Sequence, residues 1–219
     1  MDGPVRNYIW LPSIRSKRRR NWRPETRSKK PANRKRRLPI SRLRQLTDAE
    51  ASPAAADLFS AIKGKVGFVP NLYRVTGNQP AVLGGLLGLG DALGKGSFDA
   101  KTREAIALAV AGANECDYCA SAHSAISKGL KVDQAEITAR LHGASAEPRL
   151  NAILKLAVAI VNARGRVADA DLAAAREAGL DDAAIVETIG NVVANIFTNY
   201  LNHVADTEID FPAVKAKAA

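Results

Sequence analysis

Apolar residues recur at helical spacing along most of residues 45–219, and this periodicity restricts the fold more than any other feature of the sequence. Aromatic residues make up only 5% of the chain, and no segment alternates convincingly as a strand would. We therefore predict a compact all-α helical bundle. The clearest example follows Pro148, where one helix face would carry Leu150, Ile153, Leu154, Ala157, Val158 and Val161.

Prolines, glycines and capping residues divide this region into helices. Ser52-Pro53 is a typical helix start and Gly64 a typical end, while Thr47 and Glu50 form a weak capping box just upstream. The expected helices cover about 53–64, 80–93, 100–115, 116–128, 133–142, 148–163, 169–178 and a long segment after 182, with a turn and short helix at 68–73. The last helix has one apolar stripe, made of Ile185, Ile189, Val192, Val193, Ile196 and Phe197.

The formal charge of +10 is concentrated near the N-terminus. Residues 1–44 contain 16 of the 32 Lys and Arg residues but only two acidic ones, Asp2 and Glu25. Residues 45–219 contain the other 16 basic residues and 20 acidic ones, so this part is mildly acidic. Its composition gives no sign of a nucleic-acid-binding surface.

Residues 1–37 alternate runs of arginine and lysine with prolines. Such a segment has too little apolar surface to offset the entropy of ordering, so we expect a disordered basic tail before a helical domain at 38–219. Three interpretations of the tail stay open. It would bind nucleic acid or an anionic membrane through its arginines and its tryptophans, Trp10 and Trp22. Alternatively, it is an organelle-targeting peptide, or the start codon has been placed too far upstream.

Cysteine usage and hydropathy indicate the compartment. The chain has two cysteines, which cannot build a disulfide framework. No apolar run reaches the roughly 18–20 residues of a transmembrane helix, and the N-terminus lacks the apolar core of a signal peptide. We therefore expect a protein of the reducing cytoplasm.

The motif that indicates chemistry is Cys116-Asp117-Tyr118-Cys119, followed by His123. Two thiols at this spacing come close enough to form a disulfide when they stand at a helix start. The helix dipole and the free backbone N–H groups of the first turn favour thiolate over thiol. His123 lies one turn beyond Cys119 on the same face, where it is able to carry a proton to or from sulfur or a leaving group. The motif predicts a thiol redox site.

Glu104 precedes this motif in an otherwise apolar row of the preceding helix. A carboxylate is costly to bury there without a partner. His123 is the obvious partner, and the two would form a Glu–His–Cys relay. The alternative is a surface residue paired with Lys101 or Arg103.

The residues of this region resemble the alkylhydroperoxidase D-like proteins, within the broader carboxymuconolactone decarboxylase fold. The resemblance covers about residues 40–213 and is to the branch named peroxidase-related enzymes. The matching positions are Glu104, Asn114, Cys116, Tyr118, Cys119 and His123, together with Val69-Pro70-Asn71-Leu72-Tyr73 and the segment 199–208.

The resemblance implies an all-helical enzyme, usually a trimer or hexamer, that reduces hydroperoxides. Cys119 would be the peroxidatic cysteine and Cys116 the resolving one, with Glu104 and His123 as the proton relay. A dithiol or thioredoxin-like donor would reduce the disulfide, and neither a cofactor nor a metal is implied. Tyr118 is a departure, because the best-studied members carry a histidine there, which leaves the details of the relay and the electron donor open.

Other interpretations of the same residues stay open. The two cysteines would be small buried hydrophobes, or zinc ligands, although Cys-x2-Cys-x3-His supplies three ligands where structural sites use four. Tyr118, Asn199 and His203 are possible pocket residues, and the last two would otherwise lie in a subunit interface. The rival functions are a lyase or hydrolase of a small lactone that uses Glu104 or His123 as its acid–base group, and a nucleic-acid-associated protein that depends on the tail.

Overall fold

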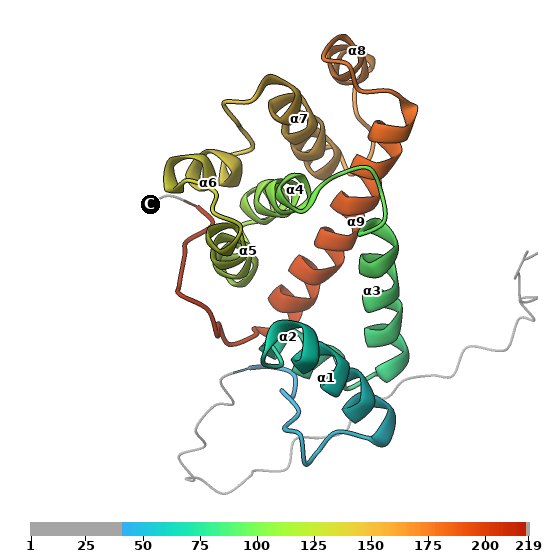
Figure 1. Cartoon of the computed structure of the whole chain (residues 1–219), viewed down its shortest axis with the longest axis vertical. Helices are drawn as coiled ribbons and strands as arrows, with labels where there is room; N and C mark the ends of the chain where they lie inside the picture. Colours follow the sequence, from blue (N-terminus) through green and yellow to red (C-terminus); the bar gives the residue numbers. More distant parts are fainter. Residues whose placement is uncertain (1–40, 218–219) are drawn as a thin grey trace, which may run out of the picture. The chain divides into compact units, whose positions relative to one another are not determined.

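The computed structural model describes residues 41–217. These residues form nine α-helices and contain no strand, which confirms the all-α prediction (Figure 1). None of the helices in this part of the chain is both long enough and apolar enough to cross a lipid bilayer. The predicted basic tail at 1–37 lies outside the described residues, so its disorder and its binding of nucleic acid stay predictions.

Each helix expected from the sequence is present. The helices are α1 (Pro53–Val66), α2 (Asn71–Thr76), α3 (Pro80–Leu93), α4 (Ala100–Ala113), α5 (Asp117–Gly129), α6 (Gln134–Leu141), α7 (Pro148–Asn162), α8 (Asp169–Glu177) and α9 (Asp182–Ala205). α1 continues past Gly64, because the chain leaves the helix only at Gly67, whose φ of 90° favours glycine.

Local capping explains where the first helices begin. The Glu50 carboxylate accepts hydrogen bonds from the Thr47 backbone N–H and hydroxyl, both at 2.9 Å, but these residues close a turn and not a helix. α1 begins instead at Pro53, behind Ser52. Asp99 caps α4 by accepting the Thr102 N–H at 2.8 Å.

α4 lies at the centre of the helices that surround the site, in contact with α5, α6, α7 and α9 (Figure 1). Residues 105–111 of α4 are all buried, and small alanines among them let the neighbouring helices approach closely. At Gly112, an added Cβ would overlap the backbone carbonyl oxygen of Leu141 at the end of α6. This packing fixes the position of Glu104, which lies beside the buried row and next to α5.

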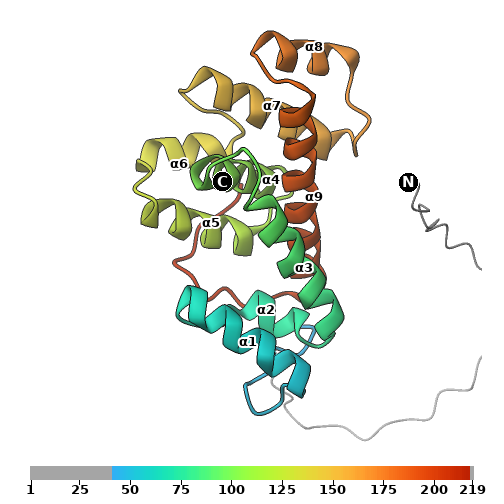
Figure 2. The same ribbon diagram turned by 45° about the vertical axis from the view of Figure 1, so that its right-hand side comes forward.

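The C-terminal segment after α9 returns to α5 and runs along it (Figures 1 and 2). Ser121 Oγ accepts the Val214 N–H at 2.9 Å, and Asp117 Oδ1 accepts the Ala216 N–H at 2.9 Å. Ala216 is itself buried. The helix that carries the cysteines is therefore held between α4 and this segment.

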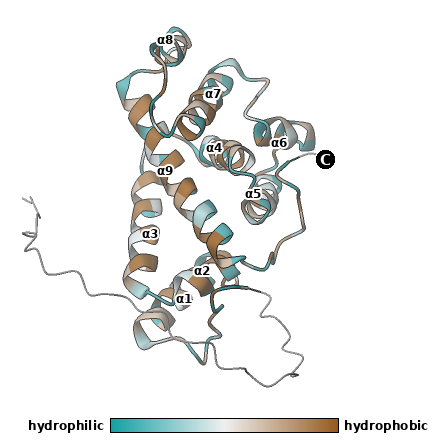
Figure 3. Cartoon of the chain, turned by 180° about the vertical axis from the view of Figure 1, so that it is seen from behind, coloured by the Kyte–Doolittle hydropathy of each residue, from teal (hydrophilic) through white to brown (hydrophobic). Residues whose placement is uncertain are grey.

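α9 does not bury the whole of its predicted apolar stripe. Ile185 and Val192 pack in the main core, but large apolar side chains remain exposed along the neighbouring face. Figure 3 shows hydrophobic residues along both α9 and the adjacent α3. The exposed members on α9 are Val186, Ile189, Val193, Phe197, Tyr200 and Val204.

Candidate functional site

Both cysteines stand at the start of α5, where the chain reverses after α4. Glu115 adopts a left-handed φ of 54°, and Cys116 then caps α5, with its sulfur accepting the Cys119 backbone N–H at 3.3 Å. The Cys116 and Cys119 sulfurs lie 2.7 Å apart, and both thiols are free and buried. Because a disulfide needs about 2.05 Å, oxidation requires only a small approach of the two sulfur atoms.

The two thiols share one acid–base equilibrium, because one donates a hydrogen bond to the other. The hydrogen bond between the two sulfurs lowers the pKa of Cys116, and burial opposes this effect without cancelling it. The same hydrogen bond and burial raise the pKa of Cys119. The pair therefore loses its first proton more readily than an isolated thiol does, and the remaining proton lies between the two sulfurs.

His123 lies one turn after Cys119 and contacts α4. Its Nδ1 is 2.7 Å from Glu104 Oε2, and each of the two side chains is 19% exposed. Burial lowers the pKa of His123, but the charge of Glu104 and the hydrogen bond to it raise the pKa by more, so the net pKa lies above the ordinary 6.5. Negative charge on Cys116 adds to the increase. The arrangement favours an imidazolium that can give up a proton.

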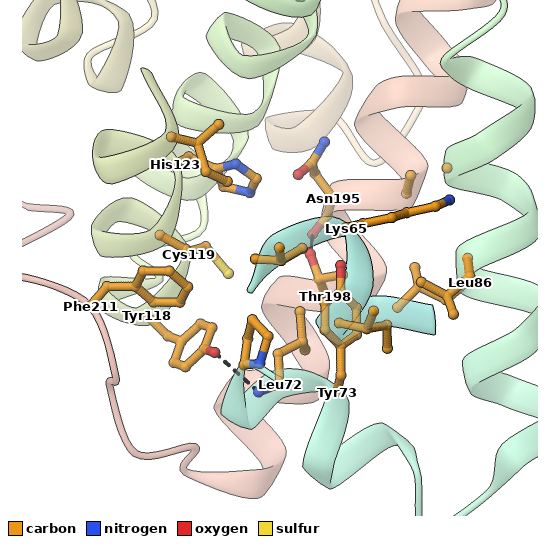
Figure 4. A pocket seen from close by; sticks show the side chains of 18 of the residues that line it. Lys65, Leu72, Tyr73, Leu86, Tyr118, Cys119, His123, Asn195, Thr198 and Phe211 are labelled. Atoms are coloured by element: carbon orange, nitrogen blue, oxygen red, sulfur yellow. Dashed lines mark hydrogen bonds between the residues drawn. The ribbon is translucent and has the colours of Figure 1, made fainter. Parts of the chain in front are cut away.

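A cavity of about 390 Å³ opens beside Cys119 and His123. Figure 4 shows the Cys119 sulfur and the His123 ring on one side of it, with α2 residues such as Tyr73 on another. Cys116 does not line the cavity, so a bound molecule would meet Cys119 first. The apolar part of the wall comes from Ile62, Val66, Pro70, Leu72, Leu86, Leu87, Ala122, Ile126, Ala194 and Phe211.

Polar groups in the wall are few, and most have internal partners. Asn195 Nδ2 donates to a backbone carbonyl of α9 at 2.9 Å, and Thr198 Oγ1 does the same at 2.9 Å. Lys65 pairs with Asp91 at 3.1 Å. The Cys119 thiol is thus the nucleophilic group in the cavity wall, and the His123 ring lies in the same wall. Among residues 41–217, no three His, Cys, Asp or Glu side chains gather closely enough to hold a metal ion.

Tyr118 also lines the cavity, but its hydroxyl is engaged away from the thiols. The hydroxyl accepts the Leu72 backbone N–H at 3.0 Å (Figure 4). It donates to Asp210 Oδ1 at 2.8 Å. Burial raises the pKa of Tyr118, so the phenol stays protonated. Phe211 packs edge-on against its ring. Tyr118 therefore connects α5 to α2 and to the C-terminal segment.

The other two predicted pocket residues differ in their surroundings. Asn199 is fully buried but does not line the cavity, and its Oδ1 accepts a hydrogen bond from Asn114 Nδ2 at 3.0 Å. His203 is exposed in the last turn of α9 and does not line the cavity either. The structure therefore brings Cys116, Cys119, His123 and Glu104 together and leaves His203 outside the site.

Two further side chains lie at the site although the sequence does not single them out. Asn202 Nδ2 donates to Cys119 Sγ at 3.3 Å. Tyr73 lines the cavity, and burial followed by the charge of Glu104 raises its pKa. Both residues fall in segments that carry the family resemblance, and that was the only available signal, because both are far from Cys119 in sequence.

Comparisons with known proteins relate part of the sequence to a family and the structure to a fold. The model of the carboxymuconolactone decarboxylase family matches residues 80–147, which include Glu104, both cysteines and His123. A crystal structure of the alkylhydroperoxidase AhpD core, an uncharacterized peroxidase-related protein from Ralstonia eutropha JMP134, has a TM-score of 0.70 and 25% identity, over 79% of this chain and 94% of that chain. Residues 80–147 therefore carry the sequence pattern of the carboxymuconolactone decarboxylase family, and the chain has the fold of the alkylhydroperoxidase AhpD core.

Two other solved structures share this fold at lower sequence identity. An uncharacterized peroxidase-related protein from Silicibacter sp. TM1040 has a TM-score of 0.65 and 23% identity, over 72% of this chain and 87% of that chain. A form of the debrominase Bmp8 in complex with 2,3,4-tribromopyrrole has a TM-score of 0.65 and 20% identity, over 80% of this chain and 93% of that chain. A search of curated protein sequences finds no match. The match of residues 80–147 and the shared fold relate this chain to peroxidase-related proteins.

Proposed function

We propose that this protein is a thiol-dependent peroxidase that reduces hydroperoxides through a Cys116–Cys119 disulfide cycle. The observation that supports it most strongly is the position of the Cys119 sulfur, which borders the cavity and lies 2.7 Å from the Cys116 sulfur. A nucleophile, a resolving thiol and a proton donor thereby lie within the first two turns of the same helix. Such a set suits a two-step oxidation of the thiol pair.

In the first step, the Cys119 thiolate attacks an oxygen of the hydroperoxide ROOH. The S–O bond forms as the O–O bond breaks, which leaves Cys119 as a sulfenic acid and releases RO⁻. His123, charged next to Glu104, gives its proton to RO⁻, and the alcohol ROH leaves. The raised pKa of His123 supports this role, because it favours the protonated imidazole over the neutral one.

In the second step, the Cys116 thiol attacks the Cys119 sulfur, water leaves and the disulfide forms. A dithiol or thioredoxin-like donor then reduces this disulfide and becomes a disulfide itself. A reducing cytoplasm supplies such donors, and we expect the protein to act there.

The apolar wall of the cavity favours an organic hydroperoxide over hydrogen peroxide. Each buried methylene adds roughly 0.8 kcal/mol to binding, and a cavity of about 390 Å³ accepts a substituent of several carbons. We expect kcat/KM to be higher for cumene hydroperoxide than for hydrogen peroxide.

Peroxide consumption with dithiothreitol as the donor tests the proposal. Cys119→Ser should abolish turnover, because serine is not a nucleophile toward the peroxide bond. Without a thiol donor, Cys116→Ser should react with one equivalent of hydroperoxide and then stop at the sulfenic acid. Turnover that survives Cys119→Ser would show that another group is the nucleophile.

Two alternative activities should be measured on the same protein and its variants. A lyase or hydrolase of a small lactone would use Glu104 or His123 and would keep full activity after Cys116→Ala. A debrominase, as Bmp8 is, would release bromide from 2,3,4-tribromopyrrole. Either result, without consumption of hydroperoxide, would replace the peroxidase proposal.

A further inference from the structure

Three asparagines at the ends of α4 and α9 form a hydrogen-bonded group beside Cys119. Asn114 ends α4, while Asn199 and Asn202 lie three positions apart on α9 and so share a face. Asn199 is 0% exposed and Asn202 is 4% exposed. Burying an amide is costly unless its hydrogen-bonding groups find partners, so each unused donor here requires an explanation.

The hydrogen bonds among these residues orient two amide groups toward Cys119. Asn202 Nδ2 donates to Cys119 Sγ at 3.3 Å. Asn114 Nδ2 donates to Asn199 Oδ1 at 3.0 Å, so the NH₂ group of Asn199 points away from Asn114. Asn199 Nδ2 is buried without a hydrogen-bond partner, yet it is close enough to Cys119 to lower the pKa of that thiol, as Asn202 does. A negatively charged Cys119 sulfur would give this donor the acceptor that it lacks.

We propose that Asn199 and Asn202 hold the negative charge of the thiol pair on the Cys119 sulfur at the moment of attack. The inference rests on the proposed peroxidase function and adds two residues to it. The step is a proton transfer within the pair: the Cys119 thiol gives its proton to the Cys116 thiolate, and no other reactant is needed. Cys116 has its own donor, the Cys119 backbone N–H at 3.3 Å. Without the two amides, the charge would stay on Cys116, which does not border the cavity.

The pH dependence of alkylation tests where the charge lies. Iodoacetamide reacts with thiolates, and peptide mapping separates the product at Cys119 from the product at Cys116. In Asn199→Leu and Asn202→Leu, alkylation of Cys119 at pH 7 should slow roughly tenfold, the effect of one lost hydrogen bond to a charged group. The midpoint of the pH profile should rise, and the rate should recover at high pH. A purely structural role for the amides would not move the midpoint.

Asn191→Leu is the matched control, because Asn191 is a buried asparagine on the same helix whose amide donates to the Glu187 carbonyl at 2.9 Å. Its alkylation midpoint should equal that of the unsubstituted protein. If a leucine variant does not fold, as judged by circular dichroism, Asn202→Asp keeps the size of the side chain and should raise the midpoint further, since a carboxylate repels a thiolate.

An unchanged midpoint for Cys119 in the folded variants would overturn the inference. Alkylation needs no hydroperoxide, so this outcome is independent of the peroxidase assay. A second outcome separates the two proposals. If the asparagine variants raise the alkylation midpoint of Cys119 as predicted but the protein consumes no hydroperoxide, the proposed function is wrong and the inference about the charge on Cys119 is retained.

Discussion

The pKa directions at the two cysteines appear opposed to their proposed roles when each residue is taken alone. Cys116 has the lowered pKa and Cys119 the raised one, although Cys119 is the proposed nucleophile. Reactivity depends on access as well as on thiolate fraction, and only Cys119 borders the cavity. A proton shared over 2.7 Å can move from one sulfur to the other. The lowered pKa is therefore a property of the pair, whereas access to the cavity is a property of Cys119.

Replacing Glu104 with glutamine should lower the pKa of His123, because the carboxylate charge that raises this pKa is removed. A raised folded-state pKa stabilises the fold fully below about pH 6.5, and this contribution disappears as the pH rises through the raised value. Glu104→Gln should therefore cost more free energy of unfolding at pH 6 than at pH 9. NMR titration of His123 and urea unfolding at the two pH values measure both effects, and an unchanged His123 pKa would contradict the pairing.

Replacing Tyr118 with phenylalanine should lower the free energy of unfolding by about 1–2 kcal/mol. The loss follows because the Leu72 N–H would lose the acceptor it now has at 3.0 Å. Tyr200→Phe is the control, since Tyr200 is 55% exposed. Urea unfolding of both variants makes the comparison, and equal stabilities would mean that the Tyr118 hydroxyl does not support α2.

At the level of helices, the sequence predicts the elements well and their long-range contacts poorly. Prolines, glycines and caps act within a few residues, so α3 is predicted with the bounds it has, Pro80–Leu93. The pairing of Glu104 with His123 could be predicted because a buried charge needs a partner. The bond between Tyr118 and Asp210 could not, because it joins residues 92 positions apart with no shared pattern. The position of Phe211 in the cavity wall could not be predicted either, because Phe211 lies in the C-terminal segment, far from the cysteines in sequence.

Gly112→Ala should destabilise the protein by roughly 1–3 kcal/mol, because the new Cβ would push α4 away from the end of α6. Gly64→Ala should instead stabilise it by about 0.5–1 kcal/mol, since alanine favours the helix and the site has open space. Chemical denaturation of the two variants compares them directly. A neutral effect at Gly112 would mean that α4 and α6 pack less tightly than described.

For the molecule as a whole, the exposed apolar face of α9 has no cover among residues 41–217. Its six side chains, Val186 to Val204, recur every three or four residues, and the adjacent α3 exposes Val82 and Leu89. Continuous apolar surface of this kind marks an interaction site. A second copy of the chain presents the same face and is complementary to it by symmetry. We therefore propose that the protein self-associates through α9.

Val193→Glu should weaken this association, because it places a charge in the middle of the apolar face. Val193 is 52% exposed, so the substitution should leave the fold of the single chain intact. Ala170→Glu, at an exposed position on α8, is the control. Sedimentation velocity should give a smaller species for the Val193 variant only, and identical profiles for all three proteins would place the interface elsewhere.

The most direct test of the thiol cycle is the mass of the peptide that contains Cys116 and Cys119 after reaction with one equivalent of cumene hydroperoxide. The proposed cycle predicts that this peptide loses the mass of two hydrogens, that both thiols become unreactive, and that a dithiol restores them. Two thiols that remain fully titratable after exposure to the hydroperoxide would contradict the central claim.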